Sequence, residues 1–334
     1  MGNDACRNSR GRAGASEVKS YQTDAETKQV WGVVYIFLPA DYSAGNINNE
    51  VYVMITDKDI SMKYIKEAMK LIENLTGNGK RSSERVFSDF LILSACSYSN
   101  FFDSRFREER EQRYLEIIKG YEKKEIAVFS EILAAISNAA ISYWNRGEIK
   151  DILGYLYTKG QYYKKSLGQF FTPEHVAYFM ARITGSDYKD LLKKREFISI
   201  SEPTCGSGVM VLAFCQMMLE DKMDYSNRLL VNAWDIDETC ALMAYLQFSI
   251  YGVPAIITHG DTLAQKAYSQ WVTPAYFAND FSGKQQRMKM IEALKELMAA
   301  PNAEAVVSVK SELADIDMQN IREKFELQSL FEAG

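Results

Sequence analysis

The run Glu202-Pro-Thr-Cys-Gly-Ser-Gly208 constrains the fold of this chain more than any other feature of its sequence. It follows an alternating stretch, Phe197 to Ser201, and precedes an apolar helical pattern from Gly208 to Leu219. Glycines in such a turn let the backbone approach a ligand closely, and the amides at a helix start favour an anionic or polar group. The run therefore predicts a strand–turn–helix unit that binds a small ligand, such as the carboxylate end of an amino-acid-like molecule.

Two further strands are predicted after this unit, at Leu229 to Trp234 and at Ala255 to Thr258, with a helical pattern from Glu238 to Tyr251 between them. The crossovers have the length that parallel strands require, so the series predicts a β-α-β-α-β unit with a parallel sheet. The segment Gln265 to Trp271 lacks an apolar strand pattern and is interpreted as a short helix or loop.

An acidic residue stands at or just after the end of each predicted strand: Glu202, Asp235 and Asp261. The carboxyl ends of parallel strands share one edge of the sheet, where ligands of doubly wound folds bind and where an acid after the second strand holds a ribose. The third glycine of the dinucleotide fingerprint is absent, and so is the Gly-Lys-Ser/Thr ending of a P-loop. A nucleoside is therefore the predicted ligand, and a dinucleotide is not.

The part of the chain ahead of this unit has a different pattern. Apolar spacing from Ser61 to about Leu156 predicts a mainly helical region, and Trp31 to Leu38 with Val51 to Thr56 predict a hairpin before it. The first two dozen residues are polar and small; a flexible tail is favoured there over a basic contact arm. Interleaved charges from Phe106 to Glu125 favour a solvated helix face over a nucleic-acid patch.

Composition limits the function classes. A net charge of −5 argues against a strongly basic nucleic-acid clamp, although a local groove or a DNA contact through a partner stays open. The five cysteines are scattered and there are only two histidines, so we expect reduced thiols and no metal site. No apolar run reaches the length of a membrane span, and a cytoplasmic location is expected.

Three segments together resemble the adenine-specific DNA methyltransferases, most of all the modification subunits of type I restriction-modification systems. They are Asp151-Ile-Leu-Gly-Tyr-Leu-Tyr157, Gly168-Gln-Phe-Phe-Thr-Pro173 and Glu202 to Gly208. The resemblance covers roughly Asp151 to Leu263 and implies S-adenosylmethionine as the cofactor and DNA as the substrate. The implied fold is α/β, a Rossmann-like methyltransferase domain behind a mainly helical N-terminal domain.

The resemblance also assigns roles at the cofactor site. It implies that the second segment packs over the methionine part, that the third holds the carboxylate end, and that Asp235 and Asp261 contact ribose and adenine. The implied cofactor-binding residues are Gly168, Gln169, Phe170, Phe171, Thr172, Pro173, Glu202, Pro203, Cys205, Gly206, Ser207, Gly208, Asp235, Ile236, Asp261 and Thr262.

The family's catalytic motif, (Asn/Asp/Ser)-Pro-Pro-(Tyr/Phe/Trp), positions the exocyclic amine of a flipped adenine, and this sequence contains no such motif. The nearest candidate is Thr273-Pro274-Ala275-Tyr276, in which Thr273, Pro274 and Tyr276 are the candidate catalytic residues. A proline turn with a packed aromatic residue is the favoured alternative for this segment.

The sheet is also expected to end after three strands, because the segment beyond Gly283 is predicted to be helical, with a break at Pro301. Its first strand would then be an exposed edge, which the C-terminal helices cover or to which a second chain, as a homodimer or partner subunit, adds the missing strands. The predicted division is a tail at 1–28, a helical domain at 29–160, a cofactor domain at 161–280 and C-terminal helices at 281–334.

Two functions follow from these expectations. One is an S-adenosylmethionine-dependent DNA adenine methyltransferase with an unusual target-base motif. The other is a catalytically inactive relative that keeps the cofactor site and acts as a regulator, an anti-restriction protein or one subunit of a split enzyme.

Overall fold

The computed structural model describes residues 58–77, 79–162 and 172–299. The predicted tail, the hairpin of Trp31 to Leu38 and Val51 to Thr56, the segment Gly168 to Phe171 and the chain after Pro301 lie outside the described residues.

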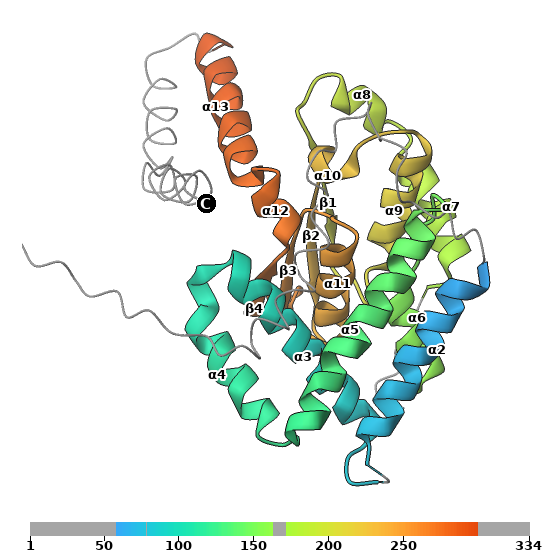
Figure 1. Cartoon of the computed structure of the whole chain (residues 1–334). Coiled ribbons are helices and arrows are strands. Elements are labelled where there is room, and N and C mark those ends of the chain that lie inside the picture. The colour runs from blue at the N-terminus through green and yellow to red at the C-terminus, as the bar shows by residue number, and fades with distance from the viewer. Residues whose placement is uncertain (1–57, 78, 163–171, 300–334) are drawn as a thin grey trace, which may run out of the picture.

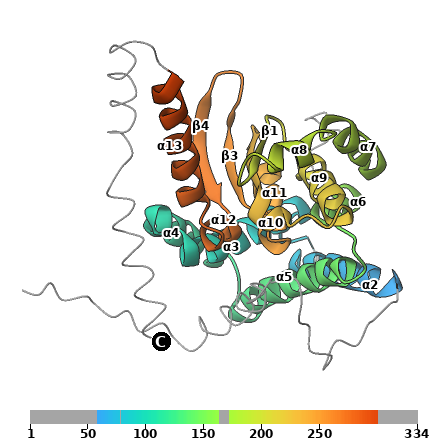
Figure 2. The ribbon, with the colours of Figure 1, turned by 90° about the horizontal axis from the view of Figure 1, so that it is seen from above.

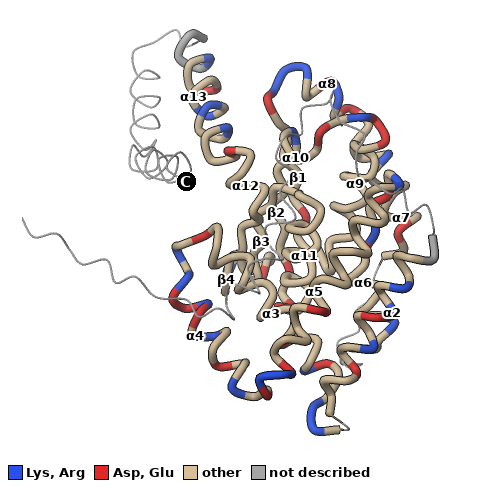
Figure 3. Tube along the Cα trace, viewed as in Figure 1, with Lys and Arg blue, Asp and Glu red and all other residues tan. Residues whose placement is uncertain are grey.

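The front of the described chain is helical, as its apolar spacing predicts. Its elements are α2 (Lys58–Leu75), α3 (Ser83–Phe102), the 3-10 turn η1 (Ser104–Phe106), α4 (Arg107–Ile118), α5 (Lys123–Trp144) and α6 (Ile152–Lys159). Helices α2 and α5 pack along each other, through buried residues such as Ile65, Ile72, Ile132 and Ile136. The charges of α4 are interleaved along a mostly exposed helix (Figure 3); the choice between a solvated face and a nucleic-acid patch stays a prediction.

Helix α5 is long and apolar enough to cross a membrane by length and composition, which the sequence analysis did not anticipate. Its apolar residues Phe129, Ile132, Leu133 and Ile136 are nevertheless buried in the same core as α2 and α3. This burial is the property of a core helix.

The second part of the chain is an α/β unit. Its elements are α7 (Glu174–Thr184), α8 (Tyr188–Leu192), β1 (Ile198–Glu202), α9 (Val209–Glu220), α10 (Tyr225–Arg228), β2 (Leu229–Asp235), α11 (Glu238–Ile250), β3 (Ala255–Asp261), β4 (Lys266–Val272), α12 (Pro274–Ala278) and α13 (Phe281–Ala299). The described strands form one sheet in the order β1-β2-β3-β4, with β1 to β3 parallel. This is the Rossmann-like arrangement that the sequence predicts.

Strand β4 corrects the prediction that the sheet ends after three strands and that Gln265 to Trp271 forms a helix or loop. It runs antiparallel to β3, with Ile257 opposite Trp271. A tight turn joins the two strands: the side chain of Asp261 accepts a hydrogen bond from the Ala264 amide at 2.9 Å. Only Trp271 and Val272 of this strand are buried, so backbone pairing rather than an apolar pattern defines it.

Helix α11 joins the two parts of the molecule (Figure 1). It packs on β2 and β3 on one side and on α3 and α6 on the other, and its residues from Cys240 to Ser249 are all buried. One hydrophobic cluster therefore runs from α2 to β4. A small second cluster, built on Phe197, Leu230 and Phe281, attaches the start of α13 to the sheet.

The two edges of the sheet differ. Beside β4, the buried side chain of Arg110 in α4 donates to the Gln270 carbonyl oxygen at 2.6 Å and lies over the ring of Trp271. At β1 no described strand pairs beyond it, and α7 lies past this edge, on the side away from β2 to β4 (Figure 2). The expectation that the first strand is an edge is thus confirmed within the described residues.

Candidate functional site

The loop after β1 has the tight turn that its glycines predict. Gly206 has a φ of 55° and Gly208, the residue before α9, a φ of 98°. A Cβ atom on Gly208 would lie 2.5 Å from the ring of Phe248 in α11. The turn therefore requires glycine at 208 both for its backbone angle and for its close packing.

Hydrogen bonds tie this loop to the ends of the neighbouring strands. The Cys205 amide donates to the Trp234 carbonyl oxygen at 2.8 Å, and the Gly206 amide donates to the Asp235 carboxylate at 2.7 Å. Thr262, after β3, donates its hydroxyl to the Pro203 carbonyl oxygen at 2.7 Å. The carboxyl ends of the three parallel strands thus form one connected surface.

Two carboxylates lie beside the loop. Asp235 is buried at the end of β2, and its carboxylate also accepts from the Asp237 amide at 2.9 Å. Burial raises the pKa of Asp235, and burial with the charge of Asp235 raises the pKa of Glu202 at the end of β1. A ligand with hydroxyl donors, such as a ribose, suits acceptors that are paired with backbone amides but have lone pairs left.

Exposed apolar side chains also follow the ends of β2 and β3. Asp261 ends β3, and both Ile236 after β2 and Leu263 after β3 are exposed, at 65% and 98%. Exposed aliphatic side chains at these two strand ends are available to contact an apolar part of a ligand. The sequence analysis did not include Leu263, because a single leucine in a turn carries no periodic signal.

The start of α7, which the predicted Thr172 and Pro173 precede, lies against Lys150 and Asp151. Glu174, the first residue of α7, accepts from the Asp151 amide at 3.0 Å and from Lys150 Nζ at 3.2 Å. Thr172 and Pro173 immediately precede it. The other predicted residues of that segment, Gly168, Gln169, Phe170 and Phe171, lie outside the described residues.

Buried hydrogen bonds that the sequence analysis did not predict also connect the cofactor loop to α6 and α11. Asp151, the residue before α6, accepts from the Ser207 hydroxyl at 2.6 Å and from the side-chain amide of Gln247 at 2.8 Å. Gln247 lies inside α11, far from Asp151 in the sequence. Only the packing of α6 on α11 brings the three residues together.

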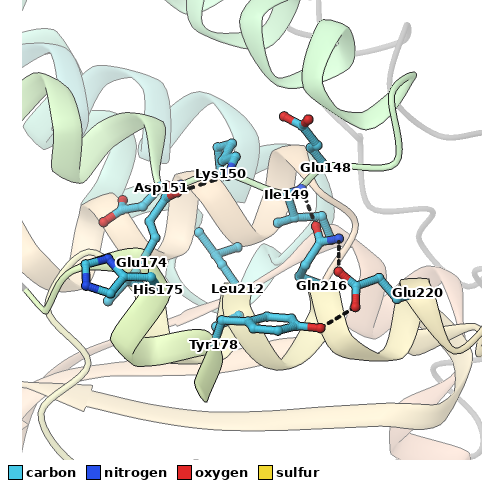
Figure 4. Close-up of a pocket in the computed structure, with 12 residues that line it drawn as sticks. Glu148, Ile149, Lys150, Asp151, Glu174, His175, Tyr178, Leu212, Gln216 and Glu220 are labelled. Carbon is cyan, nitrogen blue, oxygen red and sulfur yellow. Dashed lines mark hydrogen bonds and ion pairs between the residues drawn. The ribbon is translucent and has the colours of Figure 1, made fainter. Parts of the chain in front are cut away.

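A cavity of about 420 Å³ lies between α7, α9 and the segment Glu148 to Asp151 (Figure 4). In its wall Gln216 accepts from the Ile149 amide at 2.6 Å and donates to Glu220 at 3.0 Å, and Glu220 also accepts from Tyr178. These polar groups are paired with each other. The cavity borders the flank of α9 and not the ends of β2 and β3, so we do not place the ligand there.

The candidate catalytic residues Thr273, Pro274 and Tyr276 lie near the amino end of β3, opposite the carboxyl ends that carry the cofactor loop. Thr273 is fully buried, and its hydroxyl donates to the Val253 carbonyl oxygen at 2.8 Å and accepts from the amide of Ala255, the first residue of β3, at 2.9 Å. The length of β3 separates it from Asp261 by roughly 20 Å. The structure does not bring this group together with the cofactor loop, because β4 runs back along β3.

Four described cysteines, Cys96, Cys205, Cys215 and Cys240, are buried free thiols. Burial raises the pKa of the Cys205 thiol, so this side chain of the loop is uncharged and packs as an apolar group. Among the described residues, no cluster of His, Cys, Asp and Glu has the arrangement of a metal site.

The described strands and helices form a Rossmann-like α/β unit with a glycine loop and acidic residues at the carboxyl ends of its parallel strands. Residues 148–305 match the family described as N-6 DNA Methylase. The match covers a little less than half of the chain, and this part is similar to that family.

Two solved structures are similar to the chain. One is a protein described as a class I S-adenosylmethionine-dependent methyltransferase from Listeria monocytogenes, at 15% identity and a TM-score of 0.37, covering 63% of this chain and 56% of that one. The other is the methyltransferase subunit of a type I restriction-modification system from Streptococcus thermophilus, at 15% identity and a TM-score of 0.31, covering 73% and 59%. The chain thus spans less than two thirds of either structure, and it matches none of the curated proteins.

Proposed function

We propose that this chain binds S-adenosylmethionine at the carboxyl ends of β1, β2 and β3. The observation that supports this most is the glycine loop of Gly206 and Gly208, hydrogen-bonded to Asp235 and bordered by Asp261. The family of residues 148–305 fits the proposal, since an N-6 DNA methylase needs a methyl donor.

The side chains of this edge fit the parts of that cofactor. The loop and the start of α9 present backbone amides for a carboxylate, Asp235 offers acceptors for ribose hydroxyls, and Ile236 with Leu263 provides an apolar surface beside Asp261 for adenine. Glu202 and the predicted residues Pro203, Cys205, Ser207, Thr262, Thr172 and Pro173 line or support this surface. When bound, S-adenosylmethionine supplies an electrophilic methyl group; this chain's residues hold and orient it.

We further propose that the chain is the cofactor-binding part of a DNA adenine methyltransferase, of the kind that modifies DNA in restriction-modification systems. The base-positioning Pro-Pro motif is absent from its 334 residues. Thr273 lies near the amino end of β3, away from the cofactor loop. These two observations favour a chain that does not transfer methyl groups by itself. An inactive regulatory relative is the second candidate, supported by the same observations.

Isothermal titration with S-adenosylmethionine tests the binding proposal. Asp235→Ala removes acceptors for the ribose and for the Gly206 amide, and a charged hydrogen bond of this kind contributes about 1.5–3 kcal/mol, so we expect at least about ten-fold weaker binding. Gly206→Val places a side chain where the backbone approaches the ligand and should abolish binding.

Asp280→Asn is the control, because Asp280 lies just before α13 and away from the cofactor loop. This variant should bind S-adenosylmethionine as the unmodified chain does. Absence of binding by the unmodified chain at high protein concentration would refute the proposal.

A partner is part of the proposed function. Strand β1 is an open edge of the described sheet, and α7, which lies beyond that edge in Figure 2, exposes the apolar residues Val176, Phe179, Met180 and Ile183. We propose that a different polypeptide adds a strand parallel to β1 here, because its following loop would then reach the cofactor edge. A second copy of this chain related by a two-fold axis would instead pair its own β1 antiparallel to this β1. That pairing would bring the exposed Lys194 and Arg195 of one copy against the cofactor loop of the other. We also propose that the chain contacts DNA, directly or through this partner, and that it is located in the cytoplasm.

A further inference from the structure

We propose that Asp151 is a positioning residue for the cofactor loop: its carboxylate, held at the start of α6, fixes the conformation of Ser207 between Gly206 and Gly208. The inference deepens the proposed function and rests on it, since the loop is taken as the site of S-adenosylmethionine. Asp151 bonds Ser207 and is not among the residues proposed to contact the ligand.

Hydrogen bonds hold both the side chain and the backbone of Ser207. Its hydroxyl donates to Asp151 Oδ2 at 2.6 Å, and its carbonyl oxygen accepts from Gln247 Nε2 at 2.7 Å. The same Gln247 Nε2 donates to Asp151 Oδ1 at 2.8 Å. Side chain and backbone of one loop residue are therefore held by two partners that are bonded to each other.

Asp151 and Gln247 are fixed in turn. Asp151 accepts from the Gly154 amide at 2.8 Å as the cap of α6, and its own amide donates to Glu174 at 3.0 Å. Gln247 accepts from the Leu153 amide at 3.0 Å. Each polar side-chain atom of Asp151 and Gln247 thus has at least one hydrogen-bond partner.

Stability is a poor explanation of this network. Asp151, Ser207 and Gln247 are buried, at 9%, 0% and 1% exposure, and the burial of its carboxyl group raises the pKa of Asp151. A buried carboxylate costs desolvation free energy, and well-packed apolar groups in its place are often as stable or more so. Directional hydrogen bonds, however, select one conformation, which a loop that must match a ligand requires.

Gly154 shows how closely the carboxylate is placed. A Cβ atom on Gly154 would collide with the carboxylate oxygens of Asp151. Gly154→Ala therefore displaces the carboxylate while keeping its charge. In an ordinary helix position the same change is favourable.

The test measures two properties of the full chain: affinity for S-adenosylmethionine by titration calorimetry, and hydrogen exchange of the ligand-free loop by mass spectrometry. We expect Asp151→Ala and Gly154→Ala each to weaken binding at least about ten-fold, a factor equal to about 1.4 kcal/mol. Exchange of residues 203–209 should rise, while residues 255–261 in β3 stay unchanged. Asp151→Asn, which keeps hydrogen-bonding capacity toward all three donors after rotation of the Ser207 hydroxyl, should restore most of the affinity.

A double-mutant cycle separates positioning through Ser207 from a general effect. Once Ser207→Ala has removed the hydroxyl, the further change Asp151→Ala should weaken binding by clearly less than the roughly ten-fold expected in the unmodified chain. Asp89→Asn is the matched control: Asp89 is equally buried, at 9%, and bonds Tyr121 in the helical region, so this variant should lose stability but not affinity.

Unchanged affinity and unchanged loop exchange in folded Asp151→Ala would overturn the inference and leave Asp151 a structural residue. Failure of the unmodified chain to bind S-adenosylmethionine would refute the proposed function, and the exchange measurement would show separately whether Asp151 orders the loop.

Discussion

At the scale of single residues, the cofactor loop combines unusual backbone angles with close packing. Gly208 and Gly252 both have positive φ, at 98° and 68°, yet they differ in surroundings. A Cβ atom at Gly252 would have no atom within 4 Å, whereas one at Gly208 would meet the Phe248 ring. The pair therefore separates backbone strain from steric exclusion.

We predict that Gly252→Ala lowers the free energy of unfolding by about 1–2 kcal/mol, the cost of a left-handed conformation for an L-residue. Gly208→Ala should lower it by a further 1–3 kcal/mol or so, because the new methyl group overpacks against Phe248. Urea denaturation followed by circular dichroism measures both values. Equal losses in the two variants would show that α11 yields to the methyl group.

At the scale of secondary-structure elements, the start of α5 is held by charged hydrogen bonds. Glu125 accepts from the Glu122 amide at 2.7 Å in a capping box and forms two bonds of 3.0 Å with Arg81. Arg81 also donates to the Leu75 carbonyl oxygen at 3.0 Å and the Gly120 carbonyl oxygen at 2.7 Å. One ion pair thus joins the end of α2, the turn after α4 and the start of α5.

The Arg81 guanidinium lowers the pKa of Glu125 from 4.5 to about 2. A lowered carboxyl pKa stabilises the fold above the unfolded value and loses that contribution as the pH falls from 4.5 toward 2. Glu125→Gln should therefore cost about 1.5–3 kcal/mol at pH 7 and clearly less near pH 3. Unfolding by urea at both pH values measures the difference.

Lys124→Gln is the control for that experiment, because Lys124 and Glu122 form a pair whose side chains are 82% and 58% exposed. Its effect should be close to zero at either pH. A loss for Glu125→Gln that is the same at both pH values would contradict the assignment to the ion pair.

At the scale of the whole molecule, one core joins the helical part and the sheet, while no described strand pairs with the free edge of β1. Arg113 in α4 bonds Glu238 at the start of α11 at 2.6 Å and 2.7 Å, and Arg110 meets β4. Beyond β1, α7 exposes the apolar side chains of Val176, Phe179, Met180 and Ile183, and the turn after α8 exposes Lys194 and Arg195. The asymmetry favours association at β1.

We predict that the chain alone transfers no methyl group to unmethylated DNA, and that co-expression with a neighbouring gene product containing an (Asn/Asp)-Pro-Pro-(Tyr/Phe) loop restores transfer. Light scattering after size exclusion should then show a one-to-one complex. Phe179→Asp with Ile183→Asp should abolish the complex, because the charges would be buried under the added strand.

Leu115→Asp on α4, where Leu115 is 46% exposed, is the matched control and should leave the complex intact. A stable monomer that methylates DNA by itself, or a homodimer disrupted by the α7 variants, would contradict the proposed partner.

The sequence by itself determined the elements that have a repeating apolar pattern or a distinctive turn. The strands of the parallel sheet, the helices α9 and α11 and the glycine loop with Asp235 and Asp261 at one edge followed from local chain chemistry, because periodicity and glycine act over a few residues. The roles given to those residues remain proposals.

The tertiary structure alone decided the features that depend on residues far apart in the sequence. Strand β4 is exposed and has no apolar pattern, so only its pairing with β3 revealed it, and that pairing moved Thr273 away from the cofactor edge. The bonds between Asp151, Ser207 and Gln247 exist because α6 packs on α11. Contacts of this kind depend on the arrangement of whole elements in space, which no local pattern of residues encodes.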